Sequence, residues 1–247
     1  MKKLVLAITT LVFALVLVAC SPKEATAKGY GIAHKIYVGE VTLTVNEDGE
    51  VVSGSIEEYY LPFNVAKLGS VTEYADATDV AFGNSHGEAA FAKYFSVNDM
   101  LFTAEDSEKG EDGSYTGLPV YKNADGDTLL EWVTVEANAK AYVEGTQAGT
   151  VFIANADGTK HATYATPEGD KWTKTGTGYG NDSFVWADAM EGVIDSIVGT
   201  DMDVDYEKND EGYWVVNDMV TGATLVDYAQ YFAVAERAYD TAMADFE

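Results

Sequence analysis

The chain has 247 residues and a formal net charge of −26, because 41 acidic side chains outnumber 15 basic ones. This charge repels phosphate backbones and anionic lipid headgroups, so nucleic-acid binding is excluded as a function. The single cysteine and the three scattered histidines, His34, His86 and His161, lack the spacing of metal ligands, and the sequence therefore predicts no metal site.

The N-terminus carries an export signal. Two lysines precede an apolar run over 4–18, which ends in a Leu-Val-Ala-Cys sequence at Cys20. This pattern resembles a bacterial lipoprotein signal peptide, and the run is shorter than the roughly 20 residues that an uncleaved membrane-spanning helix needs. We therefore expect residues 1–19 to be removed and a diacylglyceryl group on Cys20 to anchor the protein on the extracytoplasmic face of the cell membrane. Residues 20–29, which hold the lipidated cysteine and small polar side chains, predict a tether.

Alternating apolar and polar residues predict three β-hairpins. Residues 36–45 and 50–56 alternate around an Asn-x-Asp-Gly turn, which is typical of a hairpin. The same turn occurs twice more, and the further hairpins expected there pair 118–121 with 129–133 and 150–153 with 161–164. Because the hairpins share one turn chemistry, we expect an antiparallel sheet.

Helical patterns complete an expected α+β fold, in which amphipathic helices pack on the sheet. A capping box at Ser85–Glu88 predicts a short helix over 89–95. Apolar residues at steps of three and four predict a helix over 183–198, which stops at Gly199, and a final helix over 225–246.

Two segments bear on the organisation of the chain. The charged loop 105–114 is the best place to divide it, and we expect an N-terminal α+β part over 30–135 and a C-terminal part over 136–247, with a single domain as the alternative. The glycine-rich segment 173–180 lacks the spacing of a phosphate-binding loop and is expected to be a plain loop.

A short turn between an apolar strand and the final helix holds the candidate site. The turn starts at Asp218 and continues through Thr221, Gly222 and Ala223 to Thr224 at the helix start. A hydroxyl in that position faces backbone N–H groups without partners and the positive end of the helix dipole, so it suits a phosphate group. Gly222 allows a bulky group near the backbone, and Ala223 keeps the turn narrow.

Residues 218–224 (Asp-Met-Val-Thr-Gly-Ala-Thr) resemble the D-x-x-[ST]-G-A-T motif of the FMN-binding domain family. This family includes subunits of the sodium-translocating NADH:quinone reductase and of the Rnf complex, and lipoproteins of extracellular electron transfer. The resemblance implies that a separate flavin transferase reads Asp218 and the residues from Thr221 to Ala223. It would esterify the phosphate of FMN onto Thr224.

The resemblance extends more loosely to the hairpin over 36–56 and to the helix over 183–198, and it implies an FMN-binding type of fold for the C-terminal part. It also implies an electron-transfer flavoprotein and not a self-contained enzyme. The expected partners are a membrane electron donor, either quinone-linked or an NADH dehydrogenase, and an external acceptor. The chain departs from many members at Val226, where they carry a second hydroxyl residue.

Thr224 has a second interpretation. Thr224-Leu225-Val226-Asp227 also fits a capping box, in which the hydroxyl only accepts a hydrogen bond from the first turn of the helix. If Thr224 carried a phosphate dianion instead, the Asp227 carboxylate would lie unfavourably close to it. Under this second interpretation the chain is a ligand-binding or adhesive lipoprotein without a covalent flavin.

Overall fold

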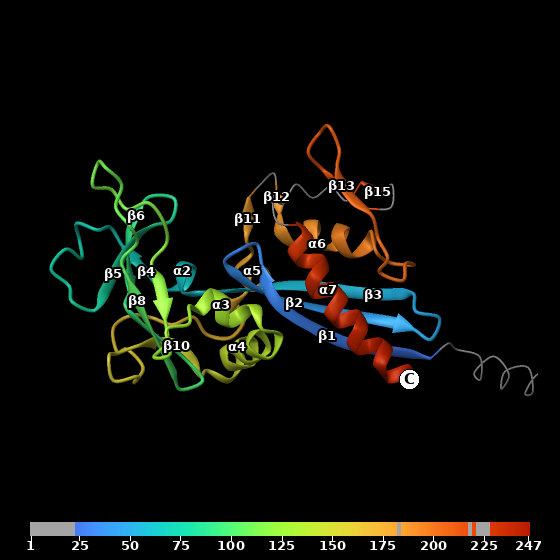
Figure 1. Cartoon of the computed structure of the whole chain (residues 1–247), viewed down its shortest axis with the longest axis horizontal. Helices are drawn as coiled ribbons and strands as arrows, with labels where there is room; N and C mark the ends of the chain where they lie inside the picture. Colours follow the sequence, from blue (N-terminus) through green and yellow to red (C-terminus); the bar gives the residue numbers. More distant parts are fainter. Residues whose placement is uncertain (1–22, 182–183, 217–218, 221–227) are drawn as a thin grey trace, which may run out of the picture.

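The computed structural model describes residues 23–181, 184–216, 219–220 and 228–247, and Figure 1 shows two neighbouring groups of elements. One group is built on a three-stranded sheet, and the other on two further small sheets. Antiparallel sheets mixed with helices make this an α+β fold, as the sequence predicts. No helix in this described part is long and apolar enough to cross a membrane.

The first group is organised around an antiparallel sheet of three strands, β1 (Glu24–Ala33), β2 (Tyr37–Asn46) and β3 (Val51–Tyr60). The first predicted hairpin is confirmed by the turn between β2 and β3. Gly49 has a φ of 86°, and the Asn46 side chain accepts hydrogen bonds from the N–H groups of Asp48 and Glu50. The expected tether over 20–29 is wrong from Glu24 onward, because these residues pair along β2.

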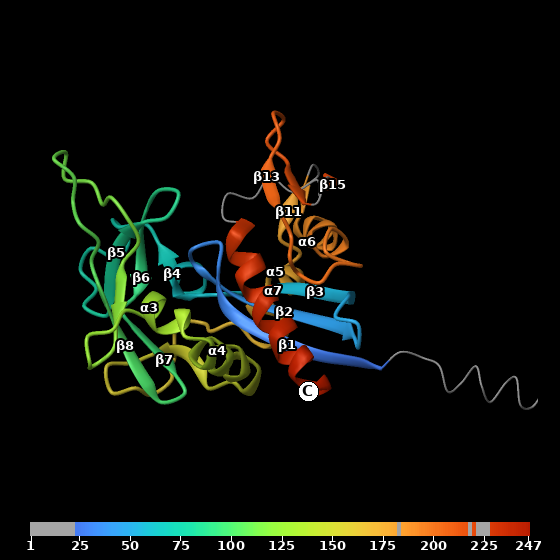
Figure 2. The same cartoon turned by 45° about the vertical axis from the view of Figure 1, so that its right-hand side comes forward.

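The two faces of this sheet are covered differently, because successive strand residues point to opposite sides. Val41 and Leu43 of β2 lie on the face covered by α6 (Trp186–Asp195) and α7 (Tyr228–Met243). Figure 2 shows α7 running across the sheet. Val38 belongs to the other hydrophobic core. The sheet therefore contributes to both cores.

Helices α6 and α7 confirm the two longer predicted helices. Trp186 and Met190 of α6 are buried on the sheet, and the chain turns after the helix at Gly199, whose φ is 80°. Phe232 of α7 is buried in the same core. The strand predicted before the Thr-Gly-Ala-Thr motif is β14 (Trp214–Val216).

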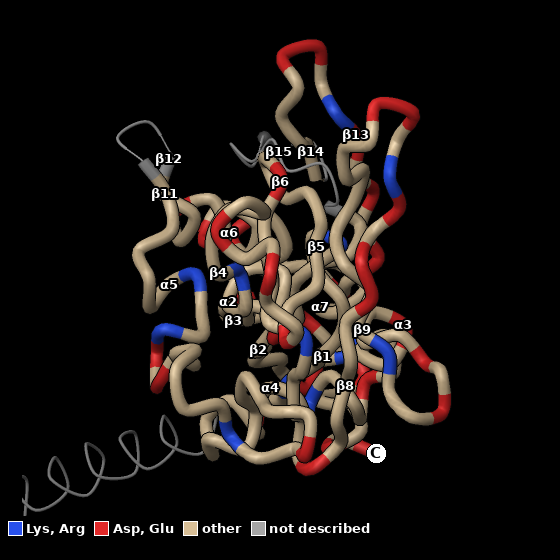
Figure 3. Tube along the Cα trace, turned by 90° about the vertical axis from the view of Figure 1, so that its left-hand side faces the viewer, with Lys and Arg blue, Asp and Glu red and all other residues tan. Residues whose placement is uncertain are grey.

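Several short elements surround these helices. Figure 3 shows acidic residues along many of the turns, including the projecting hairpin of β13 and β14. The short elements are η1 (Gly169–Trp172), α5 (Lys174–Thr177), β11 (Gly180–Asn181), β12 (Phe184–Val185), β13 (Tyr206–Lys208), β15 (Met219–Val220) and η2 (Ala244–Phe246).

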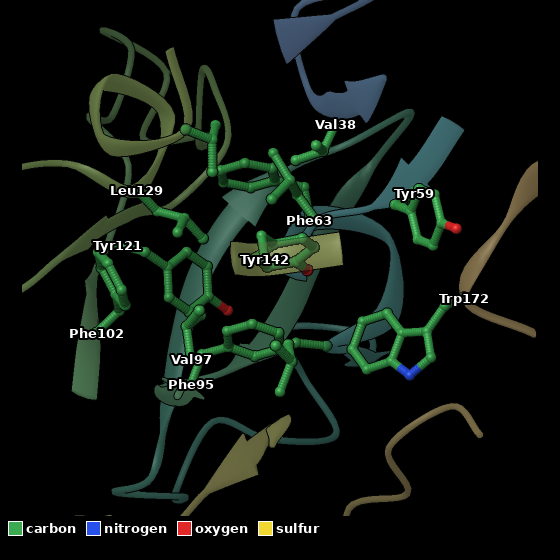
Figure 4. Packing of buried hydrophobic residues seen from close by; sticks show 14 of the residues in the cluster. Val38, Tyr59, Phe63, Phe95, Val97, Phe102, Tyr121, Leu129, Tyr142 and Trp172 are labelled. Carbon is green, nitrogen blue, oxygen red and sulfur yellow. The ribbon is translucent and has the colours of Figure 1, made fainter. Parts of the chain in front are cut away.

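The second group packs around an aromatic core, shown in Figure 4. The Phe95 ring meets Tyr121 and Trp172 edge-on, at centroid distances of 6.3 Å and 6.4 Å. The sheets have the orders β4-β6-β5 and β10-β7-β8-β9. The elements are α2 (Pro62–Val65), β4 (Lys67–Gly69), β5 (Val80–Asn84), β6 (Glu88–Ala92), β7 (Tyr94–Val97), β8 (Met100–Glu105), β9 (Val120–Lys122), α3 (Leu129–Thr134), α4 (Glu136–Ala148) and β10 (Val151–Ala154).

The helix expected over 89–95 is wrong, because this segment contains strand β6 and the start of β7. The supposed capping box is the turn of the β5–β6 hairpin, in which His86 and Gly87 have φ values of 54° and 122°. The Asn84 side chain accepts a hydrogen bond from the Gly87 N–H group. A short, nearly continuous apolar run fits a buried strand as well as a helix, so its period does not distinguish them.

The other two predicted hairpins are only half right. Each first strand exists, as β9 and β10, but α3 follows the turn after β9. Thr128 caps α3 by accepting a hydrogen bond from the Glu131 N–H group, while the Glu131 carboxylate accepts one from the Thr128 N–H group. Residues 161–164 form no strand in the described structure. The expectation of antiparallel pairing is confirmed, but the strands are divided among several small sheets.

The chain enters the second core after β3 and leaves it after η1, so the first core is built from both ends of the chain. The expected boundary at residue 135 falls between α3 and α4, which pack on each other. The division into folding units over 30–135 and 136–247 stays a prediction.

Helix α7 lies directly on glycines of β1. A Cβ atom added to Gly29 would lie 2.2 Å from the Val234 carbonyl oxygen and 2.6 Å from the Ala238 nitrogen. The Arg237 guanidinium of α7 donates a hydrogen bond to the Tyr30 carbonyl oxygen on the same strand. The helix and strand backbones therefore come too close for any side chain at Gly29.

We expect Gly29→Ala to push α7 away from β1 and to lower the free energy of unfolding by about 1–3 kcal/mol, as overpacked cores do. Urea unfolding would measure this loss. Gly117→Ala is the matched control, because its added Cβ atom meets nothing within 4 Å. Equal stability of the two variants would contradict the close approach.

Candidate functional site

The structure describes residues on either side of the predicted attachment site, but not the attachment residue itself. Asp218, the residues from Thr221 to Thr224, and Cys20 lie outside the described residues. β15 ends at Val220, and α7 begins at Tyr228. The site is therefore described through the residues around these two ends, above all those that contact the first turn of α7.

A buried ion pair lies under the first turn of α7. Glu58 of β3 has no exposed surface, and its carboxylate pairs with the Lys174 ammonium at the start of α5, which is 1% exposed. Tyr231 of α7 donates its hydroxyl hydrogen to the second carboxylate oxygen of Glu58. Three segments that are far apart in the sequence thus meet at one carboxylate.

Aromatic rings surround the buried ammonium group. The Lys174 nitrogen lies 4.1 Å from the centroid of the Tyr37 ring, 4.8 Å from that of Tyr179 and 5.5 Å from that of Trp186. These distances are within the limit of about 6 Å for cation–π attraction, which offsets part of the lost hydration. Burial lowers the pKa of Lys174 below its ordinary value, although the charge of Glu58 opposes the shift. We call Glu58, Lys174, Tyr231 and these three rings the Glu58 cluster.

Local caps hold Lys174 in place. The Thr173 hydroxyl accepts a hydrogen bond from the Gly176 N–H group at 3.0 Å and caps the single turn of α5. The Thr175 N–H group donates to the Glu57 carboxylate at 3.2 Å, which ties the turn to β3. The expected plain loop over 173–180 is therefore wrong, and Lys174 was missed. The available signals were a threonine at a cap position and a glutamate on the apolar face of a strand.

Two adjoining cavities open beside the Glu58 cluster. The first, which we call the Lys174 cavity, has a volume of about 360 Å³ and is lined by Lys174, Tyr179 and the turn after α5. The second, the β3–α6 groove, has a volume of about 480 Å³. Thr175 and Ala187 line both, so the cavities adjoin. Both volumes lie in the range of roughly 300–1,000 Å³ that is usual for ligand pockets.

Chain length limits the distance between Thr224 and α7. Three residues separate Thr224 from Tyr228, so four residue steps join them and their Cα atoms are at most about 14 Å apart. Tyr231, in the first turn of α7, contacts Glu58, and Glu58 pairs with Lys174, a residue of the cavity lining. Tyr231 and Glu58 therefore link α7 to the Lys174 cavity.

The lining of the Lys174 cavity fits the flavin that the sequence resemblance implies. A flat heterocycle needs apolar or aromatic walls and a few polar groups that orient it. Tyr179 and Val185 supply such walls and are 47% and 50% exposed. Gly178 and Gly180 have φ values of 62° and 157°, and their lack of side chains leaves room beside the turn.

The three histidines do not come together. His34 and His86 occupy turns with φ values of 44° and 54°. The His161 ring stacks on Tyr164 with centroids 4.0 Å apart, and its Nε2 atom lies 3.3 Å from the Asp79 carboxylate. Among the described residues, no group of three histidine, cysteine, aspartate or glutamate side chains could hold a metal ion.

Lys174→Met would leave the Glu58 carboxylate buried without its cation. We expect a loss of about 3–5 kcal/mol in the free energy of unfolding, the range found when one member of a buried pair is removed. Chemical denaturation at neutral pH would measure it. The double variant Lys174→Met/Glu58→Leu should lose much less, because no uncompensated charge remains. Losses that simply add would contradict a coupled pair.

A surface lysine supplies the control for this substitution. Lys140 lies 3.9 Å from Glu144, and the two side chains are 54% and 63% exposed. Lys140→Met should cost less than about 1 kcal/mol, because exposed ion pairs contribute little.

Buried tyrosines make the fold sensitive to high pH. Burial and the charge of Glu58 raise the pKa of Tyr231, and burial raises the pKa of Tyr59 to about 12. The unfolded chain therefore releases these protons first, so stability is present below about pH 10 and falls as the pH rises above it. We expect Tyr231→Phe to reduce the slope of this fall, measured by urea unfolding at stepped pH. An unchanged slope would show that Tyr231 ionises equally in both states.

Comparison with known proteins found no match: no family model matches the chain, and neither does any curated protein or solved structure. The resemblance to the FMN-binding domain family lies only in the motif over 218–224 and in the sequence patterns around it.

Proposed function

We propose that this chain is a membrane-anchored, extracytoplasmic flavoprotein that carries electrons through FMN, attached by a phosphoester to Thr224. The main support is the Asp218–Thr224 motif, which includes the two residues of β15 and precedes α7 in the sequence. A second support is the Lys174 cavity, which has a suitable size and lining and is linked to α7 through Glu58 and Tyr231.

Each part of the site would have a separate task. Thr224 would fix the cofactor by its phosphate, at the helix end where positive partial charge favours an anion. Tyr179 and Val185 would form the apolar walls, and Lys174, whose side chain is 1% exposed and paired with Glu58, would hold the turn that lines the cavity. Bound FMN would supply the redox chemistry, and the protein would supply position and electrostatics.

Electron transfer requires partners on both sides. The proposed donor is a membrane protein, either quinone-linked or an NADH dehydrogenase, and the acceptor lies outside the cytoplasm. A separate flavin transferase would form the phosphoester by using FAD, so the chain itself would not be a self-contained enzyme.

The start of β1 sets the distance from the membrane. If Cys20 carries the lipid, only residues 21–23 separate it from Glu24, the first residue of β1. Four residue steps span at most about 14 Å, so the sheet would lie close to the membrane surface. This corrects the picture of a longer tether. Glu58 lies level with Gly31 of β1, seven residues or about 23 Å along the strand from Glu24, so a membrane donor would have to reach the far end of the sheet.

The mass of the protein tests this proposal. Chain isolated with a co-expressed flavin transferase should be heavier by one esterified FMN, and Thr224→Ala should abolish the increase. Intact mass spectrometry after denaturation measures it, because only a covalent group survives unfolding. Under the capping alternative both proteins would lack FMN, and Thr224→Ala would only cost about 1 kcal/mol of stability.

Two controls make the result specific. Thr241→Ala removes an exposed hydroxyl from the same helix and should keep the full mass increase. A known substrate of the same transferase, expressed in parallel, shows that the transferase is active. An unmodified chain beside a modified control substrate would contradict the proposed function.

A further inference from the structure

The outer edge of β3 is open over part of its length. β3 pairs with β2 on one side, and its other side is covered only at the ends. At one end, Val51 exchanges backbone hydrogen bonds with Gly199 and Thr200; at the other, Tyr59 bridges to Thr173. Within the described residues, the segment over 52–56 has no strand beside it on that edge. An unpaired edge is a template for another strand.

The β3–α6 groove runs along this open edge. The five consecutive residues over 52–56 line one wall. Alternate strand side chains point to opposite faces, so a wall made of consecutive residues must include the strand edge itself. The other wall is a single stripe of α6 and the residues after it, with members at steps of three and four: Ala187, Met190, Glu191, Ile194, Asp195 and Val198. Figure 2 shows β3 at the border of the sheet beside α6.

The groove presents apolar surface next to free backbone groups. Val52 and Val198 are 40% and 43% exposed, and both line it. Gly54 lies in the middle of the edge, where an added Cβ atom would lie 2.6 Å from the Leu43 side chain and 3.2 Å from Ile194. The glycine therefore keeps α6 close to β3 and leaves the edge without a side chain that would block it.

The acidic charge of the groove favours a basic partner over a second copy of this chain. Glu191 and Asp195 are its charged lining residues, both are exposed, and no lysine or arginine lines it. A second copy of this chain would bring the same carboxylates into the interface, and like charges in contact are unfavourable. A basic partner instead complements them.

We propose that the β3–α6 groove binds an extended peptide segment of a partner protein, whose side chains on the face toward α6 include both apolar residues and lysine or arginine. The segment would add a strand to the outer edge of β3, with backbone hydrogen bonds to residues 52–56. Because every second side chain of the segment faces α6, the apolar ones would contact Met190 and Ile194 and the basic ones would meet Glu191 and Asp195. This site does not require bound flavin, but it adjoins the Lys174 cavity through Thr175 and Ala187.

A synthetic peptide tests the proposal directly. The probe is a fluorescent peptide of about seven lysine and valine residues, arranged in pairs so that each face of the strand carries both types, and it is long enough to cover five residues of β3. We expect it to bind the full chain, by fluorescence polarisation, and to slow hydrogen exchange of the backbone amides over 52–56. A peptide with glutamate in place of lysine should not bind. Absent binding, or binding without protection of these amides, would overturn the proposal.

Matched charge reversals separate recognition from general attraction to an acidic protein. Glu191→Lys/Asp195→Lys should weaken binding of the basic peptide about tenfold or more. Glu236→Lys/Asp240→Lys reverses the same residue types at the same spacing on exposed positions of α7 and should leave the affinity nearly unchanged. Equal weakening by both pairs would overturn the assignment to the groove. So would light scattering that shows a dimer with the same amides already protected in the absence of peptide.

Discussion

The buried contact between Glu58 and Lys174 is the constraint on which the first core depends. Both ions lose their hydration, and such a pair is tolerated only when hydrogen bonds and nearby groups replace the water. The Tyr231 hydroxyl and the rings of Tyr37 and Trp186 provide this replacement. Because the partners come from β2, β3, α5, α6 and α7, the requirement fixes all five elements relative to one another. The two contacts of the carboxylate are more directional than apolar packing, because a hydrogen bond requires a defined distance and angle.

The same constraint shapes the cavities. Lys174 pairs with Glu58 and belongs to the lining of the Lys174 cavity. The turn after α5 lines the same cavity and leaves it open. The β3–α6 groove continues from there along the sheet edge, and the two share Thr175 and Ala187 in their walls. If the first cavity holds the flavin and the groove holds a partner peptide, donor or acceptor would dock directly beside the cofactor. The short distance between the partner and the cofactor would then favour electron transfer without a conformational change.

The sequence predicts those elements whose signal is local. The β2–β3 hairpin follows from alternation and the Asn46–Gly49 turn, and α6 and α7 follow from apolar residues at helical spacing. The segment over 89–95 fails because a short apolar run has no distinctive period. The strand expected over 129–133 fails because the capping box of Thr128 and Glu131 decides in favour of a helix. Lys174 was missed because its cap residue Thr173 and its partner Glu58 are separate signals, and only the structure shows that the two residues of the pair meet. The Thr224 motif was found from the sequence alone.

The proposed flavin site combines a motif in the sequence with a cavity in the structure. A crystal structure of the flavinylated chain would test both together. We expect continuous electron density from Thr224 Oγ1 through a phosphate and a ribityl chain to a three-ring system between Tyr179 and Val185, beside Lys174. A Thr224 hydroxyl that only accepts a hydrogen bond from the first turn of α7, with an empty Lys174 cavity, would contradict it.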